Sequence, residues 1–492
     1  MSRLTISLPP AQQLVDGKLT GASDGATYPI LDPATGQEIG VAPDSSAADV
    51  DAAIAAARRA FDESAWATDR ALRVRCLRQL HAALTEEAEE FKALTTAEVG
   101  MPGFMMTAAG FDVPVEGLRW VTDLLESYEF ETDLGEAQPM GIPTRRTVRR
   151  EPVGVVAAIS PWNVPTQINL AKIGPALAAG CTVVLKPAPD TPWVAAELGR
   201  LVAERTDMPA GVLNVVMPRS NEVASQLTSD PRVDMVSFTG STNTGRAIMA
   251  AAAPTLKKVF LELGGKSANV VFADAKNLTE AAAVSAAGIF RNSGQVCVAG
   301  SRLLVERSVH DDFVAELAKA AKSMRVGDPL DLTTQAGAIN NATQLAQNLS
   351  FVETAQAEGG TLYQGGQRVL EDTGGYFMEP TIITDVAAHH SVAQKEVFGP
   401  VLAVTAFEDE DDAIRLANST DYGLAGGVWT SDLSRAHRMV REMHTGVVHV
   451  NTYGGPDVTV PMGGVKQSGN GHDKSLHALD KFLDLKTAWV KL

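Results

Sequence analysis

The sequence predicts an α/β protein with two regions of alternating strands and helices, and with exposed strands outside them. Three observations lead to this fold class. Short apolar runs alternate with helical patterns between residues 151 and 263, which favours a parallel sheet covered by helices on both faces. A second alternating region extends from residue 267 to about residue 450. At 492 residues, the chain is too long for one hydrophobic core and long enough for two or three domains.

The part before about residue 131 is expected to contribute a β-hairpin and two helices. The hairpin turn lies around Pro33-Ala34-Thr35-Gly36, since proline and glycine favour tight turns. The helices are expected at residues 47–61 and 70–95.

In the first alternating region, the apolar runs are expected to be strands at residues 153–159, 182–185, 212–216, 235–238 and 259–263. Helices are expected at 168–179 and 194–204, the latter beginning after Thr191-Pro192, which is typical of a cap followed by a first-turn proline. A glycine turn from Gly240 to Gly245 precedes an alanine-rich helix at 246–253. It does not follow the G-x-G-x-x-G pattern, but backbone N–H groups at that helix start can receive a pyrophosphate.

The second alternating region predicts strands at residues 268–271, 302–305, 401–406, 424–429 and 447–450, and a helix at 278–290. The acidic run 408–412 is expected to begin a helix at 412–418, where negative charge favours the positive end of the dipole. Residues 143–150 and 482–492 look like exposed strands, and such strands pair with the edge of a neighbouring sheet.

Composition limits the classes of partner. The net charge of −17 opposes nonspecific binding to nucleic acids or acidic membranes, which are polyanions. A nucleic-acid patch is the alternative interpretation of a run of four arginines, Arg145, Arg146, Arg149 and Arg150.

The N-terminal residues 1–18 lack the continuous apolar core of a signal peptide, and no run approaches the roughly 20 apolar residues of a membrane span. We therefore expect a cytoplasmic protein.

The chain has three widely scattered cysteines, Cys76, Cys181 and Cys297, which fits a reducing compartment and not a disulfide framework. Metal chemistry is poorly supported and no metal site is expected. His389 and His390 are adjacent, so in a strand they would point to opposite faces, and no cluster with ligand spacing accompanies them.

Cys297 is the candidate nucleophile. It lies among glycines and small residues, with backbone N–H groups around it and room for a substrate. Taken alone, a free cysteine is more often a small buried hydrophobe. Three segments change that balance. Glu262 ends an apolar run and can act as a general base, and Asn163 offers a side-chain amide to an oxyanion. Glu396 and Phe398 flank a tight turn that can hold a ribose and a flat ring.

Together these segments resemble the aldehyde dehydrogenase superfamily along nearly the whole chain. The matching motifs occur in the family's order: Pro161-Trp162-Asn163, Lys186-Pro187-Ala188, Phe238-Thr239-Gly240-Ser241, Glu262 to Ser267, Gly294-Gln295-Val296-Cys297 and Glu396 to Pro400. The resemblance implies that Cys297 attacks the aldehyde carbon, that Asn163 and the Cys297 N–H stabilise the oxyanion, and that Glu262 activates the water that hydrolyses the thioester. It also implies that Lys172 assists proton movement.

The resemblance further implies NAD as cofactor. The implied cofactor-binding residues are Ile159, Pro161, Trp162, Lys186, Pro189, Phe238, Thr239, Gly240, Ser241, Leu263, Gly264, Glu396 and Phe398. It divides the chain into a Rossmann-like cofactor-binding domain (1–131 and 152–263), a second α/β domain that is catalytic (264–471) and a β oligomerisation arm (132–151 and 472–492). A homodimer or homotetramer is therefore expected. A non-catalytic protein on the same fold and a CoA-acylating enzyme are the alternatives, and the presence of Cys297, Glu262 and Asn163 together argues against both.

Three departures from the family pattern matter. Pro189 stands where many NAD-preferring members carry a glutamate, so NADP is not excluded. Asp473 replaces a commoner glutamate, which leaves its part in proton transfer open. Val164 and Met462 replace bulkier aromatic residues. They predict a wide apolar tunnel for bulky aldehydes and not for betaine aldehyde.

Overall fold

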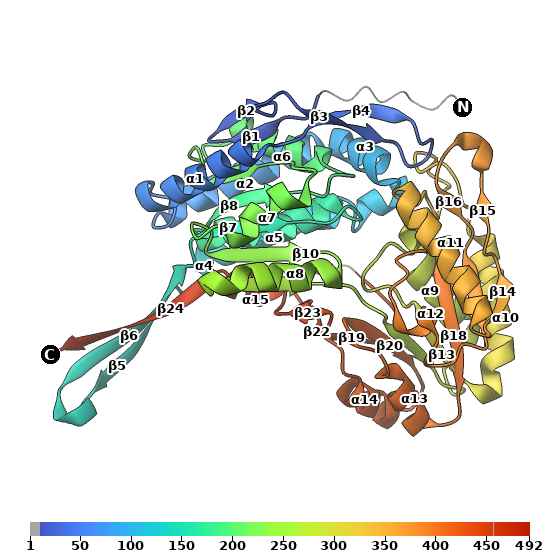
Figure 1. Ribbon diagram of the computed structural model, residues 1–492. Coiled ribbons are helices and arrows are strands. Elements are labelled where there is room, and N and C mark those ends of the chain that lie inside the picture. The colour runs from blue at the N-terminus through green and yellow to red at the C-terminus, as the bar shows by residue number, and fades with distance from the viewer. Residues whose placement is uncertain (1–9, 456) are drawn as a thin grey trace.

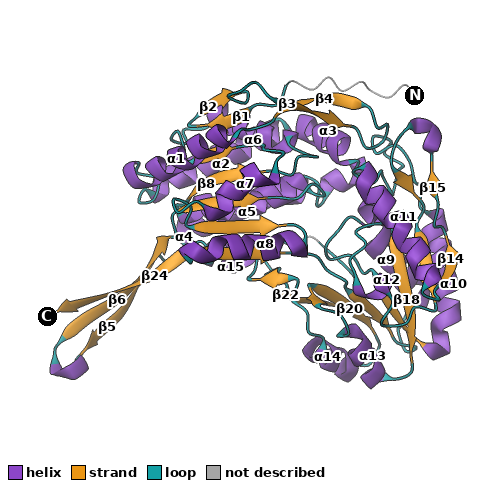
Figure 2. Cartoon of the chain, viewed as in Figure 1, coloured by secondary structure: helices purple, strands orange, loops and turns teal. Residues whose placement is uncertain are grey.

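Two sheet-centred bodies and a thin projecting arm make up the chain in the computed structural model, which describes residues 10–455 and 457–492 (Figure 1). Helices surround both large sheets, while the arm consists of strands alone apart from one short turn of 3-10 helix (Figure 2). The α/β prediction is confirmed. Residues 1–9, which belong to the segment searched for a signal peptide, lie outside the described residues.

The first sheet has the strand order β2-β1-β9-β8-β7-β10-β11-β23. Its five central strands run parallel: β9 (Leu213–Val215), β8 (Thr182–Lys186), β7 (Val155–Ile159), β10 (Met235–Thr239) and β11 (Lys258–Glu262). Antiparallel strands complete both edges: β1 (Gln13–Val15) and β2 (Lys18–Thr20) at one, and β23 (Gly469–Asn470) at the other. All five strands predicted in this region are confirmed to within two residues at each end.

Helices cover both faces of this sheet, as the unbroken apolar character of its strands predicts. Alternate residues of β7 enter different cores: Val156 and Ala158 pack on one side, and Val155 and Ala157 on the other. The first side is covered by α2 (Arg70–Glu86), α4 (Asp112–Ser127), α5 (Pro165–Ala179) and α6 (Trp193–Arg205). The second is covered by α1 (Ala47–Glu63), α7 (Asn221–Ser229) and α8 (Thr242–Ala252).

Two helix predictions are wrong in detail. The single helix expected at 70–95 is two helices, because Glu87 (φ −101°, ψ 25°) leaves the helical region between α2 and α3 (Ala88–Val99). Thr191 does not cap α6, whose N-cap is Pro192. The carboxylate of Glu98, from α3, instead accepts the N–H groups of Trp193 (2.9 Å) and Val194 (3.2 Å). The N-terminus of α6 is therefore capped by a buried acid from α3 and not by a side chain directly before the helix.

The second sheet has the order β14-β17-β18-β13-β12-β20-β21, parallel except for β14. Its strands are β12 (Ala268–Val271), β13 (Arg302–Glu306), β14 (Thr361–Gln364), β17 (Thr381–Thr384), β18 (Val401–Phe407), β20 (Ala425–Trp429) and β21 (Val447–Val450). Its helices are α9 (Leu278–Phe290), α10 (His310–Ser323), α11 (Ala342–Ala357), α12 (Ser391–Gln394), α13 (Glu410–Ala417) and α14 (Leu433–Glu442). The five predicted strands are present, and α13 begins inside the acidic run, with Asp409 as its cap.

The arm pairs distant parts of the chain. Its strands are β5 (Glu131–Ala137), β6 (Thr144–Pro152) and β24 (Leu483–Lys491), with β6 in the middle. It extends away from both sheets (Figure 1) and exposes Leu485, Trp489 and Val490. The two segments predicted to be exposed strands are therefore strands.

The remaining elements are short. They are the predicted hairpin β3 (Thr27–Leu31) and β4 (Glu38–Pro43), the pairs β15 (Arg368–Val369) with β16 (Phe377–Met378) and β19 (Tyr422–Gly423) with β22 (Val465–Lys466), and the helix α15 (Ser475–Asp480). Across the described residues, no helix combines the length and the apolar character that spanning a bilayer requires.

Candidate active site

Cys297 lies in a tight loop between the two sheets. The loop follows α9 through a 3-10 turn at Arg291–Gly294, in which Asn292 (φ 50°) and Ser293 (φ 53°) adopt left-handed conformations. Such backbone is uncommon for residues other than glycine and clusters at functional sites. Cys297 is half-buried, whereas Cys76 and Cys181 are fully buried. Burial, and then the carboxylates of Glu396 and Glu262, raise the pKa of the Cys297 thiol to about 12.

Asn163 is held against this loop. It lies between β7 and α5, and Pro165 begins α5 at a position where its missing N–H costs no hydrogen bond. The Asn163 side-chain amide donates to the carbonyl oxygen of Gln295 over 2.8 Å. The Asn292 amide in turn donates to the Asn163 carbonyl oxygen over 3.2 Å. These bonds hold the predicted amide donor against the loop of the candidate nucleophile, at Gln295, which is two residues before Cys297 in sequence.

Glu262 is the last residue of β11 and is buried. A Cβ atom on Gly265, three residues later, would lie 2.4 Å from the Cys297 carbonyl oxygen, so this segment packs directly on the nucleophile loop. One Glu262 carboxylate oxygen, Oε1, has no hydrogen-bond partner. Burial and the charge of Asp473 raise the pKa of Glu262 well above its usual value, and nearby lysines only partly oppose this. Such a carboxyl suits a general base that works near neutral pH.

Behind Glu262 lies a buried group of charged side chains. The Lys172 ammonium donates to Ser237 Oγ over 3.2 Å, and burial lowers the pKa of Lys172 to about 8. Asp473 forms an ion pair with Lys481. Burial favours a higher pKa for Asp473, but the charges of Lys481 and Lys172 outweigh it and hold that pKa below its usual value. Lys481 was not predicted, and nothing in the sequence around it signals this role.

The predicted cofactor residues gather at the carboxyl edge of the first sheet. Four neighbouring strands, β7, β8, β10 and β11, end on Ile159, Lys186, Thr239 and Glu262. In open parallel sheets, ligands bind in the crevice outside this edge. Thr239 Oγ1 is buried without a partner, and burial lowers the pKa of Lys186 to about 8. Pro161, Trp162, Pro189, Phe238, Gly240, Ser241, Leu263 and Gly264 lie within three residues of these strand ends.

The predicted phosphate turn is shorter than expected. Helix α8 begins at Thr242, not near Arg246, and the Ser241 side chain accepts the N–H of Thr244 over 3.2 Å as its cap. Gly245 is therefore inside the helix. The free N–H groups that can receive a phosphate are those of the first turn, directly after β10.

Glu396 and Phe398 face this edge from the second body. Glu396 Oε1 accepts the Gly265 N–H over 2.9 Å, and a Cβ atom on Gly264 would lie 2.2 Å from Glu396 Oε2. Burial raises the pKa of Glu396 to about 7. The Phe398 ring meets the Trp162 ring edge to face, with 5.2 Å between centroids. A buried acid, an aromatic pair, a lysine and a helix N-terminus fit a dinucleotide.

The sequence analysis did not identify two charged groups that lie near Lys186. The Asp190 carboxylate, next to Pro189, lies within electrostatic reach of both Lys186 and Arg219. Asp190 is visible in the sequence, but only the fold shows that Arg219, almost 30 residues later, faces it.

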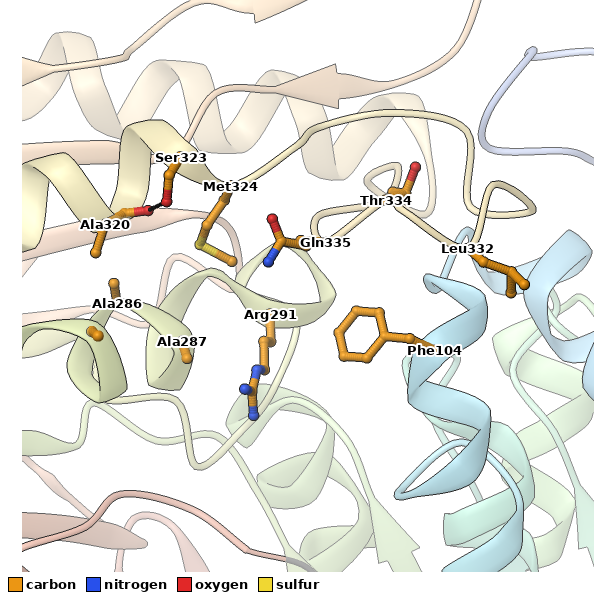
Figure 3. Close-up of a pocket in the computed structure, with 11 residues that line it drawn as sticks. Phe104, Ala286, Ala287, Arg291, Ala320, Ser323, Met324, Leu332, Thr334 and Gln335 are labelled. Carbon is orange, nitrogen blue, oxygen red and sulfur yellow. Dashed lines mark hydrogen bonds between the residues drawn. The ribbon is translucent and has the colours of Figure 1, made fainter. Parts of the chain in front are cut away.

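Two cavities flank the site. One of about 370 Å³ lies at the 3-10 turn that precedes the Cys297 loop, where Arg291 lies beside the Phe104 ring (Figure 3). None of its lining side chains is a predicted catalytic or cofactor residue. The other lies between α4 and α5 and includes Gln167, one turn beyond Asn163. Within the described residues, no three His, Cys, Asp or Glu side chains are grouped to hold a metal.

Comparison with known proteins gives one consistent result. A model of the Aldehyde dehydrogenase family matches residues 20–488. The chain is 41% identical over 482 residues to the NADP/NAD-dependent aldehyde dehydrogenase PuuC of Escherichia coli, covering 97% of this chain and 95% of that protein. It is 38% identical over 483 residues to a betaine aldehyde dehydrogenase of Cereibacter sphaeroides, covering 98% and 97%.

Solved structures agree with these sequence matches. The aldehyde dehydrogenase KauB from Pseudomonas aeruginosa superposes with a TM-score of 0.94 at 42% identity, covering 98% of this chain and 97% of that one. The indole-3-acetaldehyde dehydrogenase AldA of P. syringae, solved in complex with NAD+ and IAA, superposes with a TM-score of 0.94 at 40% identity and the same coverage.

Proposed function

The chain belongs to the aldehyde dehydrogenase family and oxidises aldehydes with NAD(P)+, and from this premise we propose that Cys297, Asn163 and Glu262 carry the reaction. The observation that supports these roles is the packing of three separate segments on one loop. Gly265, three residues beyond Glu262, touches the Cys297 carbonyl, and the Asn163 amide bonds to Gln295 in the same loop. This packing supports the proposal that Cys297, Asn163 and Glu262 act as nucleophile, oxyanion donor and base of one site.

In the first half-reaction, Cys297 Sγ, as a thiolate, bonds to the aldehyde carbon. The former carbonyl oxygen gains the electron pair and becomes an oxyanion. Asn163 has two amide protons, of which one is bonded to Gln295, so the other is available for this oxyanion together with the Cys297 N–H. When the C–O double bond re-forms, the hydrogen on that carbon leaves as hydride and a thioester remains on Cys297.

NAD(P)+ supplies the acceptor for that hydride when bound. The residues that would hold it are Lys186 and Glu396 for its ribose groups, the first turn of α8 for its phosphates, and Phe398 beside Trp162 for a flat ring. We propose that all thirteen predicted cofactor-binding residues contribute to this crevice.

In the second half-reaction, Glu262 takes a proton from a water molecule, whose oxygen attacks the thioester carbon. The C–S bond breaks, the carboxylic acid leaves with the water-derived OH, and Cys297 is released as the thiolate that the first half-reaction requires. Glu262 must be ionised to accept the proton, and the positive charges of Lys172 and Lys481 favour its ionised form. We assign Lys172 and Asp473 to the buried charges that pass this proton on.

The cavity between α4 and α5 is the proposed entry tunnel for the aldehyde, because its lining includes Gln167, which is one helical turn from Asn163 along the chain. Apolar walls and the small Val164 side chain favour medium-chain, terpenoid or aromatic aldehydes over acetaldehyde.

The exposed apolar side chains of β24 favour the arm as an oligomerisation surface, in a homodimer or a homotetramer. The domain boundaries at residues 131, 152, 263 and 471 remain predictions.

The deciding experiment follows the reduced-nicotinamide absorbance with an aldehyde panel, with and without coenzyme A. We expect reduction of the cofactor with water alone as the acyl acceptor, and none in Cys297→Ala, which should still bind cofactor. Appreciable turnover by that variant would remove Cys297 from the mechanism. A strict requirement for coenzyme A would favour the acylating alternative.

A further inference from the structure

Among the described side chains that line the cavity between α4 and α5, one alone is charged. Its walls are largely apolar and come from both helices, including Val113, Trp120 and Leu170. Gln167 is polar but neutral. The charged group is the ammonium of Lys474, at the start of α15. Apolar tunnels with one convergent charged group bind ligands that match both features.

The backbone at Lys474 is strained in a way that aims this side chain. Lys474 has φ 60° and ψ 178°, a conformation that is essentially reserved for glycine. Hydrogen bonds on both sides hold it there. Asp473 and Met462 exchange two backbone bonds (2.9 and 2.6 Å), and the Ser475 N–H donates to the Val458 carbonyl over 2.9 Å. A lysine kept where glycine would fit without strain indicates that its side chain is needed.

The neighbouring carboxylates are engaged elsewhere. Asp473 is paired with Lys481, and Asp457 accepts both the N–H and the hydroxyl of Thr459. Among the residues that the structure describes, the Lys474 ammonium has no hydrogen bond and no ion pair. Burial lowers the pKa of Lys474, while the charges of Asp473, Cys297, Asp457 and Glu262 oppose that change. Lys474 is therefore close to the nucleophile and the base and lacks a direct partner.

We propose that Lys474 is a specificity-determining residue that binds a carboxylate, or another anionic group, on the chain of the aldehyde. This rests on the proposed function and names the substrate class. Apolar walls would receive the methylenes or ring next to the carbonyl, and the ammonium would receive the anionic end. Aldehydes with a cationic end would be disfavoured by like charge in a poorly hydrated tunnel.

The test compares 4-oxobutanoate with its methyl ester, which has the same carbon chain without the charge. In the wild-type enzyme, kcat/KM should favour the acid. Lys474→Met should lower the acid-to-ester ratio by about tenfold or more, because the charge partner of the carboxylate is lost, while Lys474→Arg should keep most of the preference. Lys319→Met, an exposed lysine of α10, removes the same charge far from the tunnel and should leave the ratio unchanged.

Misfolding would be separated from loss of recognition by Lys474→Gly. Glycine accepts φ 60° without strain, so this variant should melt no lower than wild type and still lose the acid preference. An unchanged acid-to-ester ratio in both Lys474→Met and Lys474→Gly would overturn the proposal.

A second assay needs neither cofactor nor turnover. Iodoacetate is an anion and iodoacetamide is neutral, and both alkylate a thiolate. Lys474→Met should slow labelling of Cys297 by iodoacetate about fivefold or more, with little change for iodoacetamide. Equal slowing of both reagents would mean that Lys474 acts on the thiol instead, and would refute the specificity role. If the wild type oxidised no aldehyde, the proposed function would fail, and this ratio would still decide whether the tunnel attracts anions.

Discussion

Glu396 accepts the backbone N–H of Gly265 over 2.9 Å, and this bond joins the segment before β18 to the strand end that carries Glu262. The same carboxylate lies within electrostatic reach of the Cys297 thiol. A residue assigned to cofactor binding therefore also influences the charge of the nucleophile. The two functions of the crevice are linked through one side chain.

The first prediction follows from that link. Burial, Glu396 and Glu262 raise the pKa of Cys297 to about 12, so the reactive thiolate is a small fraction at neutral pH and grows about tenfold per pH unit below that pKa. Alkylation by iodoacetamide without cofactor should rise at this rate from pH 7 to about pH 10. Glu396→Gln removes a negative charge, which lowers the thiol pKa and should speed labelling at pH 8. A labelling rate that does not change with pH would contradict the raised pKa.

The second prediction separates the half-reactions. Glu262→Gln should retain some acylation, give a burst of reduced cofactor and then stop as the thioester. Mass spectrometry of the quenched enzyme should find the acyl group on Cys297. If Glu262 also helps to deprotonate the thiol, the burst itself will slow. Full steady turnover, or no thioester at any time, would count against the role of Glu262 as base.

The third prediction concerns cofactor choice. Asp190 and Arg219 bring opposite charges close to Lys186, so neither sign dominates where a 2′-phosphate would lie. We expect NAD to be used with weak discrimination against NADP. Pro189→Glu should raise the NAD/NADP ratio of kcat/KM, because a like-charge contact with the phosphate costs about 1–3 kcal/mol. An unchanged ratio would mean that the ribose is recognised by other residues.

The fourth prediction concerns tunnel width. Val164 is buried beside Asn163, where a larger ring would narrow the path to Cys297. Val164→Phe should reduce kcat/KM for bulky aldehydes and spare acetaldehyde, since each methylene that no longer fits loses about 0.8 kcal/mol. Val164→Ile, a smaller change, serves as the matched control. The wide-tunnel idea would be wrong if the wild type preferred acetaldehyde and its kcat/KM fell steadily with chain length.

The fifth prediction concerns stability. Glu98 is fully buried and accepts two N–H groups at the start of α6. Glu98→Ala leaves both without a partner, which should cost about 1–3 kcal/mol for each group and lower the thermal midpoint measurably. Glu98→Gln keeps one acceptor and should cost less. Glu89→Ala, on the exposed side of the same helix, should change the midpoint little, and an equal loss in both alanine variants would refute the capping role.

Strands were predictable because their signal is local. The run 153–159 is apolar throughout, and a strand buried on both faces has this pattern whatever surrounds it. Helix α6 shows the limit. Its local signal, Thr191-Pro192, suggested a side-chain cap, whereas the acceptor comes from Glu98, 95 residues earlier in the chain. The break at Glu87 was missed for a similar reason, since tertiary packing interrupts a sequence that favours one helix.

The sequence identifies those residues of the candidate site that lie in motifs, and it does not identify those that depend on distant pairing. Cys297, Asn163 and Glu262 were each identified from adjacent residues. Lys481, Arg219 and Lys474 carry no local signal, because the fold alone brings them near the crevice. The strain at Lys474 exists only in the folded chain, where Met462 and Val458 hold its neighbours.

The order of the strands in the first sheet also affects how the protein is made. Strand β23, which pairs with β11 beside Glu262, is synthesised long after every other strand of that sheet. A nascent chain that already contains Cys297 therefore still has an open β11 edge at the position of Glu262, the proposed general base. Catalytic competence must arrive late in translation, and until then this edge is the natural site for chaperone protection or for aggregation.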